Sequence, residues 1–159
     1  MPKVTDRNVE REVSDHPQDP CGPATSLRIS DTGGLTQFGA AVDILPPGSK
    51  TALKHWHAHE DEVVFVLDGV ATVIEGDEVY QLGVGEAATF KAGAEAGHYV
   101  ENRGDSDLRL FVVGTRAMVD EVRYPDHDRV LFRARDGAGG GEDRFETFDG
   151  EAAGSPYRM

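Results

Sequence analysis

Histidines and carboxylates are concentrated in one short stretch near the middle of the chain. Residues 55–62 read His-Trp-His-Ala-His-Glu-Asp-Glu. Side chains alternate between the two faces of a β-strand, so His55 and His57 would point to the same side of an extended chain. Two such imidazoles with a carboxylate just downstream, at Glu62, form a partial ligand shell for a divalent metal. A separate segment supplies a further imidazole at His98. These residue types predict a metal site built from two parts of the chain.

The composition is that of a soluble globular protein with one domain. Its 159 residues are 38% hydrophobic and 28% charged, which is enough for one substantial core. No apolar run approaches the roughly 20 residues that a membrane-spanning helix needs. The N-terminus is not followed by the apolar segment typical of a secretory signal. We therefore expect a cytoplasmic protein without a membrane partner.

Acidic side chains outnumber basic ones by 29 to 16, which gives a formal net charge of −13. Binding to nucleic acid or to anionic lipid depends on lysine and arginine, so this balance argues against both partners. The single cysteine, Cys21, excludes an internal disulfide and has no second cysteine to form a redox or metal motif. A small molecule is the partner that we expect.

Short apolar segments separated by glycine-rich turns predict an all-β core. The predicted strands cover residues 38–44, 63–67, 70–75, 78–82, 87–90, 98–100 and 108–114. Gly76-Asp77 is typical of a two-residue hairpin turn. The run 63–67 is apolar at every position, so we expect it to be buried on both faces. Many short strands at close spacing are typical of a β-sandwich or a barrel.

The segments on either side of this core show no sustained periodicity. Residues 1–33 are rich in Pro, Asp, Ser and Gly, and we expect an irregular N-terminal arm. Residues 34–115 are the predicted β core. Residues 116–159 are expected to form an irregular C-terminal extension that packs on the barrel or on a partner subunit, in which 144–148 could form a late strand.

The histidine-rich stretch resembles the first sequence motif of the cupin superfamily, G-x5-H-x-H-x(3,4)-E-x6-G. The residues at the motif positions are Gly48, His55, His57, Glu62 and Gly69. Six residues, instead of five, separate Gly48 from His55. The spacing from Glu62 to Gly69 agrees with the motif.

A later stretch is similar to the second cupin motif, G-x5-P-x-G-x2-H-x3-N. The residues at its positions are Gly85, Lys91, Gly93, His98 and Asn102. Lys91 replaces the proline, and four residues instead of two separate Gly93 from His98. These departures lie in turns before the ligand, so they change the shape of the pocket more than the number of ligands.

The resemblance covers residues 48–102, and the predicted strand order extends it to about 35–115. It implies a double-stranded β-helix, the cupin jelly-roll barrel, with a metal held inside. The metal ligands that it implies are His55, His57, Glu62 and His98. Small cupins commonly pair through sheet edges and exchange terminal arms, so the resemblance also implies a homodimer.

His57 and His59 could instead be the two histidines of the first motif, because they are also two residues apart. In that register Glu62 would come one residue too early for the motif. We therefore prefer His55 and His57 as ligands, and we expect His59 at the rim of the site or in support of a ligand.

A site with three imidazoles and one carboxylate suits Fe(II), Mn(II), Zn(II), Ni(II) or Co(II). Such a metal can polarise carbonyl or enediolate oxygens, activate water or, if it is iron, bind dioxygen. The ligands alone do not choose among these reactions. Tyr99, Glu60 and Asp61 are the nearby candidates for a catalytic acid or base.

Further phrases resemble a bacterial group of single-domain cupins, some of which are provisionally labelled sugar-phosphate isomerases. These phrases are Gly34–Gly39, His55–His57, Val113–Arg116 and Tyr124–Asp126. The resemblance implies a metal-dependent sugar or sugar-phosphate isomerase. The alternatives are an iron-dependent dioxygenase, a metal-dependent lyase, or a cupin that binds a small molecule without catalysis. A phosphorylated substrate would need cations, and those near the motifs are Lys54, Lys91, Arg103 and Arg116.

Overall fold

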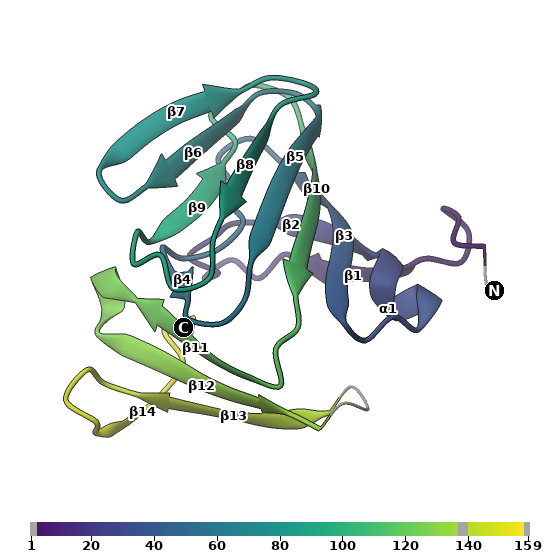
Figure 1. Ribbon diagram of the computed structural model, residues 1–159. Coiled ribbons are helices and arrows are strands. Elements are labelled where there is room, and N and C mark those ends of the chain that lie inside the picture. The colour runs from purple at the N-terminus through teal and green to yellow at the C-terminus, as the bar shows by residue number, and fades with distance from the viewer. Residues whose placement is uncertain (1–2, 137–139, 158–159) are drawn as a thin grey trace.

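The computed structural model describes residues 3–136 and 140–157, and it is almost entirely β-structure (Figure 1). The elements in chain order are β1 (Glu10–Ser14), β2 (Ala24–Arg28), α1 (Ile29–Gly33), β3 (Phe38–Leu45), β4 (Trp56–His57), β5 (Glu62–Asp68), β6 (Ala71–Glu75), β7 (Glu78–Leu82), β8 (Ala87–Phe90), β9 (His98–Glu101), β10 (Leu108–Thr115), β11 (Val119–Tyr124), a short 3-10 turn (Pro125–His127), β12 (Arg129–Arg135), β13 (Gly141–Glu146) and β14 (Ala152–Ala153). Within these ranges no helix has the length and apolar character to cross a membrane.

Two sheets form a barrel, and a third sheet lies beside it. The six-stranded sheet has the order β1-β2-β3-β10-β5-β8, and the three-stranded sheet has the order β7-β6-β9. The third sheet has the order β14-β13-β12-β11-β4 and lies below the barrel in Figure 1. The all-β barrel expected from the sequence is confirmed, and each strand predicted in the core is present.

The core lies between the two barrel sheets. Its most buried side chains, each at most 1% exposed, are Leu45, Val64, Val66, Val73, Val100, Leu108 and Leu110. Alternation along β5 explains this, because Val64 and Val66 face inward while Phe65 and Leu67 are 37% and 41% exposed. The expectation that this run is buried on both faces is wrong, since its outer face is partly open to solvent.

The two terminal segments are more regular than the sequence predicts. In the N-terminal segment, β1 and β2 extend the six-stranded sheet by pairing with the edge of β3. In the C-terminal segment, β11 to β14 form most of the third sheet. Four of the five residues of β1 are exposed, as are four of the six residues of β13. Strands with so few buried positions carry no hydrophobic alternation, so their sequences do not indicate a strand.

The histidine-rich stretch is held between the barrel and the third sheet. His57 and Trp56 of β4 pair with Val122 and Arg123 of β11. His55, just before β4, forms an isolated bridge with His98 of the barrel. The histidine-rich stretch therefore has hydrogen-bonded partners on both sides.

Candidate metal centre

Three of the four predicted ligands form one cluster. The ligand atoms of His55, Glu62 and His98 all lie within 4.8 Å of one another. His98 and Glu62 are the first residues of β9 and β5. The backbone N–H groups of His55 and His98 each donate to the other's carbonyl oxygen, at 3.2 and 2.8 Å, which places the two side chains next to each other.

Hydrogen bonds to the Nδ1 atoms leave the other ring nitrogens of two histidines free to bind a metal. His55 Nδ1 lies 2.8 Å from the Leu53 carbonyl oxygen, and His57 Nδ1 lies 2.6 Å from Oδ2 of Asp120. A carbonyl and a carboxylate accept hydrogen bonds, so each Nδ1 carries a proton, and a neutral imidazole in this tautomer has its lone pair on Nε2. This is the support that metal-binding histidines commonly receive.

His98 provides an independent indication that the cluster fits a cation. Its ring stacks on Phe90, with 3.6 Å between centroids and 2° between planes. Its Nε2 atom is buried and has no hydrogen-bond partner among the described residues, and the closest carboxylate oxygen, Oε2 of Glu62, is 3.7 Å away. An unpartnered buried polar atom is uncommon in proteins, and a metal ligand is one explanation for it.

The electrostatics of the cluster favour the protonation states that metal ligands need. Burial, together with the neighbouring His57 and His98, lowers the pKa of His55 to about 4. Burial opposes ionisation of Glu62, but the adjacent His98 and the other two histidines outweigh it and lower the pKa of this carboxyl. Near neutral pH the site therefore offers a neutral imidazole at His55 and a carboxylate at Glu62.

His57 borders the cluster and also belongs to a second group of potential ligands. Its ring meets that of His55 edge to face, with 5.1 Å between centroids. Its ligand atoms are grouped within 4.8 Å with carboxylate oxygens of Glu60 and Asp120. We interpret this second group as the hydrogen-bonded support of His57, and binding of His57 to the same metal as His55 stays a prediction.

Asp120 is the residue near this centre that sequence reasoning misses. It lies on β11, its side chain is fully buried, and its second oxygen accepts the backbone N–H of His59 at 2.9 Å. The side chain of His59 is 53% exposed, in keeping with a place at the rim. Asp120, Val122 and Tyr124 alternate as the buried positions of β11. The only sequence signal for Asp120 is an aspartate at a position of β11 where an apolar residue would be expected. Its partner, His57, is 63 residues away, so local spacing does not connect the two.

The three candidate acids and bases have different surroundings. Glu60 is 8% exposed, accepts the backbone N–H of Ala117 at 2.9 Å and pairs with Arg135. Asp61 is exposed and accepts the backbone N–H of Ala92, which is a structural contact.

Tyr99 follows His98 directly on β9 and so belongs to the opposite face of that strand. Its ring lies 5.3 Å from Lys50 Nζ, and burial raises its pKa. Of the three candidates, Glu60 is the one that the structure brings to the metal side of the barrel.

A cavity of about 270 Å³ adjoins the cluster and contains both acidic and basic side chains. His57, Glu60 and Glu62 line it, as does Asp43 of β3. Burial raises the pKa of Asp43, and the nearby charge of Glu62 acts in the same direction. The arginines in its lining are Arg28, Arg116 and Arg135.

Of the four cations expected near the site, Arg116 alone lines this cavity. Lys54 donates to the carbonyl oxygen of Gly76 at 2.6 Å, and Arg103 is exposed and pairs with Glu101. Lys91 lines a separate small hollow beside His98. Arg28 and Arg135 were not among the expected cations, because they lie far from the motifs in the sequence.

Comparisons with known proteins agree with this geometry. The family model described as Cupin domain matches residues 41–114. A crystal structure of a cupin-superfamily sugar phosphate isomerase from Silicibacter pomeroyi is 31% identical, with a TM-score of 0.81, over 98% of this chain and 99% of that one. A protein from Acidithiobacillus ferrooxidans, provisionally described as a sugar phosphate isomerase, is 25% identical, with a TM-score of 0.79, over 92% of each chain.

A predicted oxalate decarboxylase from Thermotoga maritima shares the fold at 21% identity and a TM-score of 0.60, over 72% of this chain and 99% of that one. A search of the curated proteins gives no match. The motifs, the barrel and the full-length similarity to the Silicibacter structure together show that this chain belongs to the cupin superfamily.

Proposed function

We propose that this protein is a metal-dependent isomerase of the sugar or sugar-phosphate type. The observation that carries the proposal is the partly buried cluster of His55, Glu62 and His98 beside a cavity lined by carboxylates and arginines. The two similar structures described as sugar phosphate isomerases support the same reaction class. The small-molecule substrate would enter through the cavity.

A divalent transition metal bound by His55, His57, Glu62 and His98 would act as a Lewis acid toward a substrate carbonyl oxygen. The chain itself has to move a proton between two neighbouring carbons, which needs a group that accepts it at one carbon and returns it at the other. Asp43 is our candidate for this role, because it lines the cavity and burial raises its pKa, which makes the carboxyl a better proton acceptor. Glu60 is anchored by Arg135 and the Ala117 amide, so we assign it to positioning.

The first test is elemental analysis of protein purified without chelator. We expect close to one transition-metal ion per chain, lost in both His55→Ala and His98→Ala. Aldose–ketose interconversion would then be assayed on sugars and sugar phosphates, with Asp43→Asn expected to retain the metal and lose turnover. Val79→Ala, an exposed residue of β7 outside the lining of the cavities described here, is the control that should retain both.

The alternatives are separate outcomes of the same experiment. Iron, with substrate-dependent oxygen consumption, would identify a dioxygenase, and cleavage of the substrate would identify a lyase. Tight binding without turnover would leave a non-catalytic binding protein. A wild-type chain that neither contains nor takes up metal would contradict the proposal.

We also propose that the protein is a cytoplasmic homodimer, as predicted from the sequence. Support comes from the outer face of β5, where the exposed Phe65 and Leu67 are apolar residues that a partner could cover. Sedimentation at micromolar concentration should give twice the chain mass of 17.2 kDa. A monomer under these conditions would contradict the dimer and leave the metal site unaffected.

A further inference from the structure

A second and larger cavity lies next to the 270 Å³ cavity, and most of its charged side chains are arginines. It measures about 840 Å³. The charged residues in its described lining are Arg28, Asp31, Arg116, Arg133, Arg135 and Asp143. Four guanidinium groups and two carboxylates line the cavity, and two further carboxylates, Glu12 and Glu60, pair with Arg28 and Arg135 from outside the lining. Because the whole chain carries a formal charge of −13, four arginines in one cavity are a local feature that composition does not predict.

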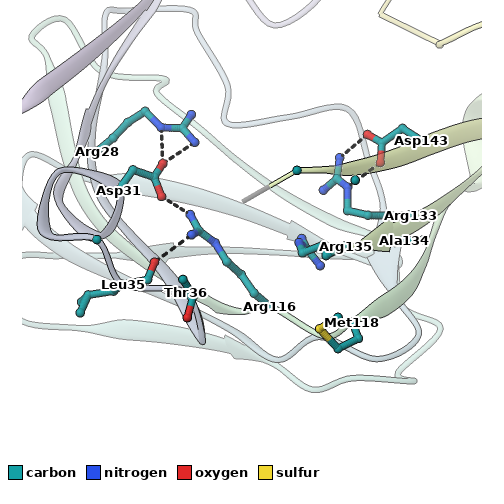
Figure 2. Close-up of a pocket in the computed structure, with 13 residues that line it drawn as sticks. Arg28, Asp31, Leu35, Thr36, Arg116, Met118, Arg133, Ala134, Arg135 and Asp143 are labelled. Carbon is teal, nitrogen blue, oxygen red and sulfur yellow. Dashed lines mark hydrogen bonds and ion pairs between the residues drawn. The ribbon is translucent and has the colours of Figure 1, made fainter. Parts of the chain in front are cut away.

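The arginines come from three parts of the fold and face the same space (Figure 2). Figure 2 shows Arg28 and Asp31 on one side, Arg133 and Asp143 on the other, and Arg116 reaching between them. Arg28 ends β2, Arg116 follows β10, and Arg133 belongs to β12. A basic site is therefore assembled by the packing of the two terminal segments against the barrel.

Carboxylates hold these guanidinium groups in fixed orientations. Asp31 accepts from Arg28 Nε at 2.7 Å and also pairs with Arg116, so one negative charge serves two positive ones. Arg133 forms two parallel hydrogen bonds with Asp143, at 3.0 and 2.9 Å. Groups oriented before a ligand arrives lose less conformational entropy when they bind it.

Arg135 connects this cavity to the metal centre. Its Nη1 group pairs with Glu60 and donates to the Ala117 carbonyl oxygen at 2.7 Å. Within the described part of the chain, its Nε and Nη2 groups have no hydrogen-bond partner. Arg28, Asp31, Arg116 and Arg135 line both cavities, so a ligand in the larger one lies beside the cavity that His57 and Glu62 line.

We propose that the larger cavity binds the phosphate group of a phosphorylated small-molecule substrate whose reacting carbons lie at the metal cluster. This inference rests on the proposed isomerase function and specifies its substrate class. A phosphate monoester carries about −1.5 to −2 charges at pH 7, so it can pair with several of these guanidinium groups at once. Its three terminal oxygens accept the parallel N–H groups that guanidinium presents, and a carboxylate offers one oxygen fewer.

The test compares binding of four probes to wild-type protein by calorimetry: inorganic phosphate, glucose 6-phosphate, glucuronate and glucose. We expect both phosphates to bind, glucuronate to bind at least about tenfold more weakly than glucose 6-phosphate, and glucose to give no heat. Raising the salt concentration should weaken phosphate binding, since charge pairing contributes to it. Equal affinity for glucuronate and glucose 6-phosphate would overturn the assignment to phosphate.

Variants locate the site. Arg116→Gln and Arg133→Gln should each weaken phosphate binding about tenfold or more, because each removes charge-assisted hydrogen bonds. Arg144→Gln is the matched control: it removes the same charge from the neighbouring strand β13, where Arg144 is 64% exposed and outside this cavity. Arg116→Lys, which keeps the charge but not the planar donors, covers the case in which Arg116→Gln fails to fold.

Metal content measured in every variant separates this inference from the proposed function. Variants that keep their metal and lose phosphate binding would support the phosphate site. Variants that keep both would overturn it and leave the metal-dependent function intact. A wild-type protein that binds metal but no phosphate at millimolar concentration would overturn the inference as well.

Discussion

Single residues outside the cupin motifs hold the predicted metal ligand His57 and the neighbouring Glu60 in place. His57 is oriented by Asp120, and Glu60 is oriented by Arg135 and the Ala117 amide. Each partner lies more than 50 residues away in the sequence. Ligand residue types could be predicted from local spacing, but their supporting partners could not, because those contacts depend on how the chain returns to the same place.

Asp120→Asn should weaken metal binding by about 10- to 100-fold, the usual effect of removing a partner that orients a ligand. Asparagine has a single acceptor oxygen, so it cannot serve both His57 Nδ1–H and the His59 amide as Asp120 does. Competition with a chelator of known affinity would measure the change. Glu121→Gln, on the same strand, is the control and should bind metal like the wild type. Unchanged affinity in Asp120→Asn would show that His57 is not held for the metal by this contact.

Cys21 should react slowly with alkylating reagents as long as the protein is folded. The side chain is 8% exposed, and burial, with a contribution from the charge of Asp19, raises its pKa to about 11. The ordinary thiol pKa is about 8.5 to 9. At pH 8 the folded protein therefore has very little thiolate, and iodoacetamide should modify urea-unfolded protein much faster.

The same shift predicts the direction of a pH effect on stability. Above the ordinary thiol pKa the unfolded chain loses the proton of Cys21 while the folded chain keeps it. The contribution of Cys21 to stability should be complete below that value and decrease as the pH rises toward 11. A Cys21→Ala variant should lack this component of the alkaline decrease, and an identical decrease in both proteins would contradict the buried thiol.

At the scale of elements, a strand can be predicted from the sequence when one of its faces is buried, because only then do apolar residues alternate along it. The predicted core strands became β3 and β5 to β10, and each contains at least one buried position, in alternation along β5, β8 and β9. Gly76-Asp77 forms the predicted two-residue turn between β6 and β7, where Glu75 pairs with Glu78. Strands β1 and β13 of the terminal segments have no buried position, and the buried positions of β11 include the charged Asp120, so these sequences do not indicate strands. The arginine-lined cavity formed by those segments was for that reason not predicted either.

Gly69→Ala should destabilise the barrel more than Gly85→Ala does. Both glycines have φ values near +87°, so both substitutions carry the left-handed backbone cost of about 1–2 kcal/mol. A Cβ at Gly69 would lie 3.2 Å from the Asp107 carbonyl oxygen and 3.3 Å from Leu108 Cα, whereas one at Gly85 would meet nothing within 4 Å. Crowding should add about 1–3 kcal/mol at Gly69 alone. Urea unfolding measures both, and equal losses would mean that the chain relaxes around residue 69.

At the scale of the whole molecule, metal binding should stabilise the folded state, because its ligands come from separate segments of the chain. His55, Glu62 and His98 meet only when β4, β5 and β9 are in place. The unfolded chain lacks this cluster, so a metal present at 100 times its Kd should add about 2.7 kcal/mol.

Adding a chelator to metal-loaded protein should lower the Tm by about 5–10 °C for a chain of this size. Calorimetry with and without chelator would measure the difference. His98→Ala provides the control, since its Tm should not respond to chelator. A wild-type Tm that is also insensitive, in protein shown to contain metal, would contradict a site that couples these strands.

The pairing of β4 with β11 has a consequence for how this protein can be divided. The recognised cupin segment ends at residue 114, yet His57 is held from outside it, by backbone pairing with Val122 and by the carboxylate of Asp120. A fragment that ends at residue 114 would keep every motif residue but lose the contacts that hold His57 in place. Grafting or shuffling this barrel as a module would therefore have to carry β11 with it. The segment needed to form the site is therefore longer than the segment by which the family is recognised.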